Sequence, residues 1–346
     1  MRAVRLTAYG APPVLTEVAE PEAGPGDVLV RVAGAGVCHS DLHVIDAKAA
    51  GLPFRPPFTL GHEVAGWVSA LGEGASGFAI GDPVAVYGPW GCGQCQRCRA
   101  GTENYCDRRA ELGFLGVGLG IDGGMAATVR VPSTRLLVPL GDLEPWRAAA
   151  LTDAALTSYH AISGCRADLS PTSAALVIGV GGLGHLAVQL LRALTKTRII
   201  ALDTREEALV LAERSGADRL VRAGPAAGQR IRAATDGYGV DAVFDFVGSD
   251  PTLALASEVL RGHGELVIVG SGGGRLTVTK PAALPPGTRI SLPYWGSRPD
   301  LVAVIELAQR GQLRVAAEAF PLEQALDVFA RLRAGTIAGR AVLVPG

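Results

Sequence analysis

The chain has 346 residues, which is long for one domain and suits two. Its net charge of −1 gives no electrostatic reason to expect nucleic acid or an anionic membrane as a partner. Arg2 and Arg5 lead into a strand-like pattern without a signal peptide, and no apolar stretch is typical of a membrane span. We therefore expect a protein of the cytoplasm.

Short strand-like segments fill the first half of the chain, up to about residue 150. Residues 28–32 and 64–70 are examples of short alternating segments, and Gly, Pro and Asp interrupt this part of the chain, which predicts strands. This half is therefore expected to be mostly β, with long loops.

Strands alternate with helices in the second half, from about residue 153 to about residue 290. The expected strands are residues 174–179, 198–203, 242–247 and 265–270, and the expected helices are residues 182–194 and 206–215. This alternation is typical of a parallel, doubly wound sheet. A strand-like run at residues 341–344 ends the tail, and the sequence does not identify its partner.

A glycine motif opens the first expected helix of this half, in the stretch ALVIGVGGLGHLAVQLL. The spacing is G-x-G-x-x-G, an apolar strand precedes it, and Asp203 ends the next strand 19 residues after Gly184. Backbone without Cβ atoms can approach a pyrophosphate, which then lies at the positive end of a helix. The cofactor-binding residues predicted here are Gly179, Gly181, Gly182, Leu183 and Gly184.

Asp203 also bears on the choice of dinucleotide. A carboxylate at this strand end accepts hydrogen bonds from the adenosine ribose and repels a 2′-phosphate, which favours NAD over NADP. Arg205 is the counter-signal, because an arginine there could pair with that phosphate.

Four of the six cysteines lie in the segment GCGQCQRCRAGTENYC, as Cys92, Cys95, Cys98 and Cys106. In a reducing cytoplasm such a cluster favours a metal over disulfides. Four thiolates satisfy tetrahedral zinc and leave no open position, so we expect a structural zinc that folds a lobe of about residues 90–108. An iron–sulfur carrier is the alternative, although its fourth cysteine follows after three residues and precedes proline. Here the gap is seven residues and Asp107 follows.

Cys38 in GVCHSDLHV and His62 in LGHEVAGWV are candidate ligands of a second zinc. Taken alone, Cys38 is equally well explained as a small buried apolar residue, and His62 as a buried imidazole with its hydrogen bonds made. Together with the cysteine segment and GVGGLG, these segments stand in an order that resembles the zinc-dependent medium-chain alcohol dehydrogenases. The resemblance covers nearly the whole chain and is greatest to bacterial secondary-alcohol dehydrogenases with an LTDA segment.

This resemblance implies an α/β protein with two domains. Residues 1–152 and 290–346 would form a GroES-like, mostly β catalytic domain, and residues 153–289 a Rossmann NAD-binding domain. It also implies a homodimer or a homotetramer.

The resemblance implies a catalytic zinc held by Cys38, His62 and Asp153, in addition to the structural zinc. Many relatives carry cysteine where Asp153 stands, and Asp153 is also suited to begin a helix over residues 154–162. Glu63 matches a carboxylate that approaches the metal as ligands exchange. Asp41 matches an outer acid that orients His62.

An open zinc acts as a Lewis acid, so the resemblance implies hydride transfer from a zinc-bound alkoxide to NAD. Alcohols would be oxidised reversibly to ketones or aldehydes. Ser40 and His43 match a relay that carries the alcohol proton away. His39 and Arg340 match cationic positions that contact the cofactor pyrophosphate.

The substrate pocket can be assigned only by the same resemblance. Ser40 and the small residues Ala282 and Ala283 would leave room for two substituents on the carbinol carbon, so secondary alcohols are expected to be preferred, with primary alcohols also accepted. The alternatives are a polyol (sorbitol-type) dehydrogenase, a zinc-free quinone or enone reductase, and a non-catalytic zinc- and NAD-binding protein. The other expected pocket residues are Phe54, Trp90, Leu119, Tyr294 and Trp295.

Overall fold

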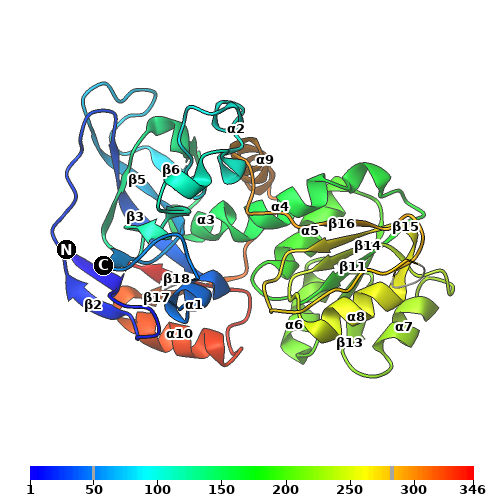
Figure 1. The fold of residues 1–346 in the computed structure, drawn as a ribbon. Helices are drawn as coiled ribbons and strands as arrows, with labels where there is room; N and C mark the ends of the chain where they lie inside the picture. The colour runs from blue at the N-terminus through cyan, green and yellow to red at the C-terminus, as the bar shows by residue number, and fades with distance from the viewer. Residues whose placement is uncertain (49–50, 281–283) are drawn as a thin grey trace. The chain divides into compact units, whose positions relative to one another are not determined.

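The computed structural model describes residues 1–48, 51–280 and 284–346. These residues form two compact units, Met1–Leu156 with Trp295–Gly346, and Thr157–Tyr294 (Figure 1). The expectation for Ala282 and Ala283 falls outside the described residues. In the described part of the chain, every helix is too short or too polar to cross a membrane.

The first unit is built mainly on strands. They are β1 Arg2–Leu6, β2 Val14–Glu17, β3 Val28–Val37, β4 Phe58–Thr59, β5 Glu63–Leu71, β6 Pro83–Val86, β7 Gly116–Val117, β8 Gly120–Ile121, β9 Thr128–Val131, β10 Leu137–Pro139, β17 Ala317–Pro321 and β18 Arg340–Val344. The larger sheet has the order β10-β6-β5-β3-β18-β17, with β9 also paired to β3, and a smaller sheet has the order β2-β1-β4. The helices are α1 His39–Ile45, α2 Gln96–Arg99, α3 Pro145–Ala148, α9 Arg298–Gln309 and α10 Ala325–Arg333, and α4 Ala154–Ser163 runs from this unit into the next.

The C-terminal tail closes on the first half of the chain through β18. This strand pairs antiparallel with β3, with Val342 opposite Gly36. Strand β3 extends beyond the predicted residues 28–32. The prediction stopped there because residues 33–36 are Ala and Gly, which are weak strand formers by themselves. Neighbouring residues approach these positions closely, since a Cβ atom at Gly34 would lie 2.7 Å from the Val342 Cγ1 atom.

The second unit is an alternating α/β structure around one sheet. Its strands are β11 Ala174–Ile178, β12 Arg198–Asp203, β13 Arg219–Arg222, β14 Val240–Asp245, β15 Leu260–Ile268 and β16 Arg289–Ser291, and its helices are α5 Gly184–Leu194, α6 Glu206–Arg214, α7 Ala227–Ala233 and α8 Asp250–Val259. The order β13-β12-β11-β14-β15-β16 with parallel pairing is that of a doubly wound dinucleotide-binding fold. The predicted parallel sheet is therefore confirmed.

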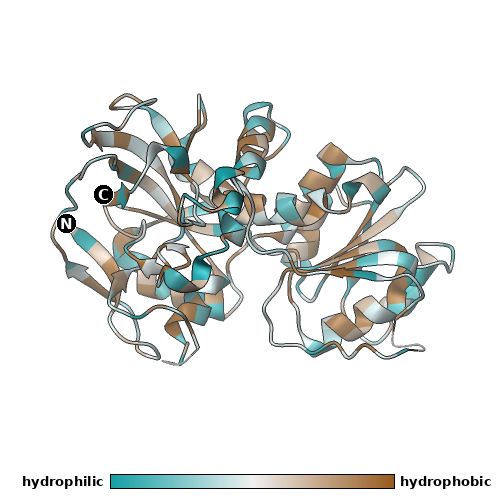
Figure 2. Ribbon diagram, turned by 45° about the horizontal axis from the view of Figure 1, so that its top comes forward, coloured by the Kyte–Doolittle hydropathy of each residue, from teal (hydrophilic) through white to brown (hydrophobic). Residues whose placement is uncertain are grey.

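The core of this sheet is apolar, as Figure 2 shows by the brown colour of its strands. Helix α5 contacts α6, and α7 contacts α8. Strand β14 ends at Asp245, two residues before the predicted end. The Asp245 Oδ1 atom accepts hydrogen bonds from the backbone N–H groups of Val247 and Gly248, both at 2.9 Å, which turns the chain out of the sheet.

Candidate metal centres and cofactor site

A buried cluster of metal-binding side chains forms where β3 ends and β5 begins. One ligand atom each from Cys38, His62, Glu63 and Asp153 lies within 4.8 Å of all the others. Cys38 follows the last residue of β3, and Glu63 is the first residue of β5, paired with Gly36 of β3. The pairing of these two strands therefore brings together segments that are distant in the sequence.

His62 is held in one orientation by Asp41. The Nδ1 atom of His62 lies 3.1 Å from Asp41 Oδ1, and the other carboxylate oxygen of Asp41 accepts a hydrogen bond from the Cys38 backbone N–H at 2.9 Å. A carboxylate only accepts, so Nδ1 carries a proton, and in the neutral ring Nε2 is the nitrogen left to bind a metal. Among the described residues Nε2 has no hydrogen-bond partner, although His62 is only 2% exposed. A buried nitrogen with a free lone pair fits a metal ion.

Asp153 lies in the same cluster and directly precedes α4. Its Oδ2 atom is 3.6 Å from the Cys38 Sγ atom and 3.7 Å from His62 Nε2. The three residues thus present sulfur, nitrogen and oxygen at one point, which is a donor set that zinc takes. The position also suits the start of a helix, so the two interpretations of Asp153 are compatible.

The electrostatics of the cluster favour a bound cation. Burial by itself would lower the pKa of His62, but Asp41 and Asp153 beside it raise that pKa well above its ordinary value. Burial would raise the pKa of the Cys38 thiol, yet the Arg340 charge and the hydrogen bond with His62 bring it below its ordinary value. The cluster therefore gathers negative charge that a divalent cation would compensate.

Arg340 is the cation that the structure places at this cluster. Its Nε atom donates to Glu63 Oε2 at 3.0 Å, its other end contacts Glu63 Oε1, and one terminal nitrogen lies 3.5 Å from Asp153 Oδ2. Arg340 is 3% exposed and Glu63 is fully buried. The contact of Arg340 with a pyrophosphate remains a prediction.

Gly36 has a structural role that the sequence analysis missed. A Cβ atom at Gly36 would lie 1.9 Å from Glu63 Oε2, so any larger residue would displace this carboxylate. This role follows from the strand register, which places Gly36 opposite Glu63. The register is known only once β3 and β5 are paired. In the sequence itself, the hint was that Gly36 stands two residues before the candidate ligand Cys38.

The predicted relay residues lie on α1. Ser40 is half-buried, with its Oγ atom 3.6 Å from Cys38 Sγ. His39 and His43 are exposed. Three positions separate Ser40 from His43, so both lie on one face of this helix.

Trp295 is the expected pocket residue that the structure places against the cluster. Its ring meets the His62 ring edge-on, with centroids 5.6 Å apart, and its Nε1 atom donates to the Thr152 carbonyl at 3.1 Å. Thr152, also missed by the sequence analysis, precedes Asp153 and accepts a hydrogen bond from the Val64 backbone at 3.2 Å. The other expected pocket residues are Phe54, Trp90 and Leu119, which are buried in the first unit, and Tyr294, which is 36% exposed in the second.

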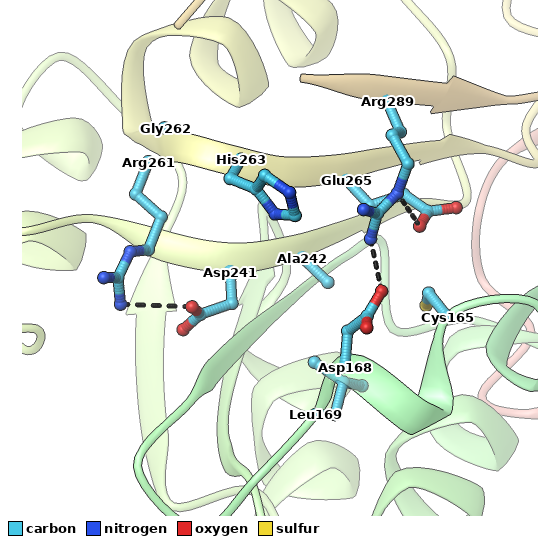
Figure 3. Close-up of a pocket in the computed structure, with 10 residues that line it drawn as sticks. All are labelled: Cys165, Asp168, Leu169, Asp241, Ala242, Arg261, Gly262, His263, Glu265 and Arg289. Atoms are coloured by element: carbon cyan, nitrogen blue, oxygen red, sulfur yellow. Dashed lines mark hydrogen bonds and ion pairs between the residues drawn. The ribbon is translucent and has the colours of Figure 1, made fainter. Parts of the chain in front are cut away.

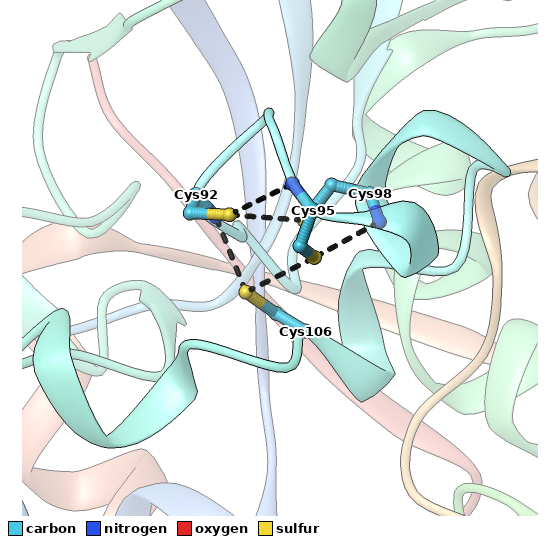
Figure 4. Close-up of side chains that lie close together, drawn as sticks. All are labelled: Cys92, Cys95, Cys98 and Cys106. Carbon is cyan, nitrogen blue, oxygen red and sulfur yellow. Dashed lines mark hydrogen bonds between the residues drawn. The ribbon is translucent and has the colours of Figure 1, made fainter.

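The four clustered cysteines converge on one point of the lobe (Figure 4). The sulfur atoms of Cys92 and Cys98 are 3.9 Å apart, as are those of Cys95 and Cys106. Tetrahedral zinc with bonds of about 2.3 Å requires sulfur atoms about 3.8 Å apart, whereas a disulfide bond is about 2.05 Å long. The spacing therefore fits a zinc tetrathiolate.

The backbone around this cluster supports a thiolate at Cys92. The N–H groups of Gln94 and Cys95 point at the Cys92 sulfur, at 3.5 and 3.3 Å, and lower the pKa of Cys92 to about 6. The lobe is also tied to α9, because the Gly101 carbonyl accepts a hydrogen bond from the Arg298 backbone at 2.9 Å. A metal here would hold a segment that has few buried apolar residues of its own.

The glycine motif has the geometry of a pyrophosphate site. Gly179 has a φ of +84°, and a Cβ atom at Gly184 would lie 2.0 Å from the Gly179 carbonyl oxygen. Both positions therefore require glycine, for the turn and for the close packing of α5 on β11. A Cβ atom at Gly181 would meet no described neighbour closer than 4.0 Å, so the backbone there is open to a ligand. Gly182 and Leu183 complete the loop before α5 and are half-buried.

Asp203 ends β12 beside this loop and is 7% exposed. Its two carboxylate oxygens accept hydrogen bonds from the backbone N–H groups of Val180, at 2.8 Å, and Arg205, at 2.9 Å. The Arg205 Nε atom lies 3.5 Å from the same carboxylate. The carboxylate is thus fixed at the strand end, and the guanidinium is drawn toward it.

Two family models match the chain, the alcohol dehydrogenase GroES-like domain over residues 24–142 and the zinc-binding dehydrogenase domain over residues 182–310. The chain is also 36% identical, over 357 aligned residues and 100% of both chains, to an NAD-dependent alcohol dehydrogenase of Saccharolobus solfataricus. The chain belongs to the zinc-dependent medium-chain alcohol dehydrogenase family.

Solved structures of this family share the fold. The alcohol dehydrogenase of the archaeon Aeropyrum pernix has a TM-score of 0.93 and 38% identity, with 100% of both chains covered. An acetophenone reductase of Geotrichum candidum, solved in complex with NAD, has a TM-score of 0.87 and 30% identity over 99% of this chain and 96% of its own. The predicted α/β fold with GroES-like and Rossmann parts is confirmed, and so is the prediction of an NAD-dependent alcohol dehydrogenase.

Proposed function

We propose that this family member binds two zinc ions per chain and oxidises alcohols reversibly to ketones or aldehydes, with secondary alcohols preferred. The observation that carries the proposal is the buried donor set of Cys38, His62 and Asp153, in which His62 Nε2 lacks a hydrogen-bond partner among the described residues. Three protein donors leave one position open for substrate, while the four cysteines of the lobe form a closed site.

The proposed chemistry divides between the metal and the side chains around it. Bound zinc would supply Lewis acidity, which lowers the pKa of a coordinated hydroxyl group toward neutrality. Asp41 keeps the proton of His62 on Nδ1, so that Nε2 stays a ligand. Ser40 accepts the proton of the alcohol and passes it on, because a hydroxyl both accepts and donates. The exposed His43, on the same face of α1, releases the proton to water.

Glu63 and Arg340 control the charge beside the ligands. A fully buried carboxylate without a partner would be strongly destabilising, and Arg340 supplies that partner. Glu63 is thereby kept within reach of the other cluster residues while its charge is compensated.

The proposed cofactor is NAD. The fixed Asp203 carboxylate would accept hydrogen bonds from ribose hydroxyls and repel a 2′-phosphate. The Asp203 carboxylate lies beside Arg205 and partly neutralises its positive charge, which a 2′-phosphate would need for binding.

The preference for secondary alcohols is supported by an apolar side chain beside the metal ligands and by a relative. The Trp295 ring lies against His62 and offers an apolar wall beside the metal ligands, and the small side chain of Ser40 lies 3.6 Å from the Cys38 sulfur. The similar acetophenone reductase is named after a ketone, and a ketone is the oxidised form of a secondary alcohol. We further propose a homodimer or homotetramer. We also propose a location in the cytoplasm, in agreement with six cysteines that form no disulfide bond.

A substrate screen tests the proposal. We expect NADH formation with 2-butanol to exceed that with 1-butanol, and sorbitol to give the lowest rate, with NADP a poor substitute for NAD throughout. Highest activity on sorbitol would indicate a polyol dehydrogenase, and binding of zinc and NADH without alcohol-dependent NADH formation would indicate a non-catalytic protein. Brown, iron-containing protein would contradict the zinc assignment of the lobe.

A further inference from the structure

The dinucleotide-binding unit has cavities that the proposed reaction does not use. One of about 280 Å³ is lined by charged side chains that already pair with one another (Figure 3). Arg289 contacts Asp168 and lies 3.3 Å from Glu265, and Arg261 lies 3.1 Å from Asp241. Its three carboxylates exceed its two guanidinium groups by one negative charge, but each of these five groups is already held in an ion pair, so the cavity offers no free charged group to a ligand.

A second cavity, of about 650 Å³, has a different charge balance. It lies where β12 and β13 begin, and we call it the basic bowl. Four cations against two acids leave an excess of two positive charges. The charged residues that line it are Arg192, Lys196, Arg198, Arg219, Asp218 and Asp236.

Several N–H donors of the basic bowl form no hydrogen bond with the described residues. Lys196 is exposed, and within the described ranges it makes no hydrogen bond or ion pair. In the part of the chain that the structure describes, Arg198 donates once, to the Ala234 carbonyl at 2.6 Å, and Arg219 once, to the Asp218 carbonyl at 3.2 Å. A guanidinium carries five N–H groups, so both arginines keep most of their donors free.

A buried hydroxyl adds a second, independent observation. Thr197 lines the basic bowl, is 1% exposed, and its Oγ1 atom has no hydrogen-bond partner among the residues that the structure describes. A buried hydroxyl without a partner costs about 1–3 kcal/mol. A ligand oxygen that accepts from this hydroxyl would remove that penalty.

The basic bowl is separate from the dinucleotide site. Strand β12 runs from Arg198 at the basic bowl to Asp203 beside the glycine loop. Five steps of about 3.3 Å place the two ends of this strand about 17 Å apart. A cofactor bound at the glycine loop therefore leaves the basic bowl free.

We propose that the basic bowl binds a soluble ligand that carries a diphosphate or triphosphate. Phosphate oxygens match both the point charge of Lys196 and the planar donors of Arg198 and Arg219. The excess of positive charge attracts such an anion, and the volume falls within the range of small-ligand sites, about 300–1,000 Å³.

The test uses zinc-loaded protein saturated with NADH, so that the dinucleotide site is already filled. Inorganic tripolyphosphate is titrated into it by calorimetry at low ionic strength. We expect one site per chain whose affinity falls as salt is added. Lys196→Glu should weaken binding at least tenfold, and Thr197→Val about threefold while raising the melting temperature of the free protein. The control Lys280→Glu makes the same charge change on an exposed residue outside the basic bowl and should leave the affinity unchanged.

The outcomes separate the possibilities. Binding absent from the NADH-saturated protein, or weakened equally by Lys196→Glu and Lys280→Glu, would overturn the proposal. Titration with ADP distinguishes the source of the phosphate. Tighter binding of ADP than of tripolyphosphate would show a nucleotide site. Weaker or equal binding of ADP would show a polyphosphate site. Both results support the assignment.

Discussion

Replacing Arg340 by methionine probes the buried ion pair beside the proposed catalytic zinc. The substitution keeps a long apolar side chain but removes the charge that faces both oxygens of Glu63. Glu63 is fully buried and Arg340 is 3% exposed, so water cannot replace the lost partner. Breaking a buried pair in this way costs about 3–5 kcal/mol, because one charge is left uncompensated.

This loss can be measured as a melting temperature. The first unit consists of Met1–Leu156 and Trp295–Gly346. For a unit of this size each kcal/mol shifts the melting temperature by about 2–4 °C, so Arg340→Met should lower it by about 6–20 °C. The assay is thermal unfolding of zinc-loaded, cofactor-free protein, which keeps any effect on NAD binding out of the measurement.

The matched control is the double variant Arg340→Met/Glu63→Gln. A glutamine carries no charge, so the double variant should recover at least half of the lost stability. A double variant that melts as low as Arg340→Met alone would refute the reasoning, since the cost would then come from lost packing. Titration of the same variants with NADH reports separately on the predicted pyrophosphate contact.

Four further outcomes are expected. Cys95→Ser should lower the zinc content by about one ion per chain and the melting temperature with it; lost turnover with unchanged melting would contradict a structural role. His43→Ala should slow turnover most at low pH, where proton release is hardest, and an unchanged pH–rate profile would remove His43 from the relay. Asp203→Asn should raise kcat/KM for NADP relative to NAD at least tenfold; an unchanged ratio would show that this carboxylate does not discriminate. Burial lowers the pKa of His185 to about 4. The unfolded chain, with a pKa of about 6.5, therefore takes up the proton first, and stability at pH 5 should be about 2 kcal/mol below that at pH 7, a loss that His185→Gln should not show in urea unfolding.

The sequence was most informative where the chemistry depends on local spacing. The glycine motif, Asp203 and the four-cysteine segment each lie within or beside one short segment, so residue type and order predicted their geometry. The alternation of strands and helices predicted the parallel sheet for the same reason, with errors of a few residues at strand ends such as Asp245, where a side chain turns the backbone.

The contacts that depend on strand register could not be predicted. Gly36 makes room for Glu63 only because β3 and β5 pair in one register, and Arg340 reaches Glu63 only because β18 pairs with β3. Such pairings join residues far apart in the chain, and nothing in the local composition specifies them. The same limit explains why Thr152 was missed, since its contacts with Val64 and Trp295 arise from packing.

The central claim is tested most directly by adding zinc back to metal-free protein while NADH formation from 2-butanol is followed. The account predicts no alcohol-dependent NADH without zinc, and a rate that reaches its plateau at about two zinc ions per chain. Asp153→Ala should then bind about one zinc ion and stay below a hundredth of the plateau rate, with the lobe still folded. Full activity of the metal-free protein, or of Asp153→Ala, would contradict the assignment of Cys38, His62 and Asp153 as the catalytic zinc site.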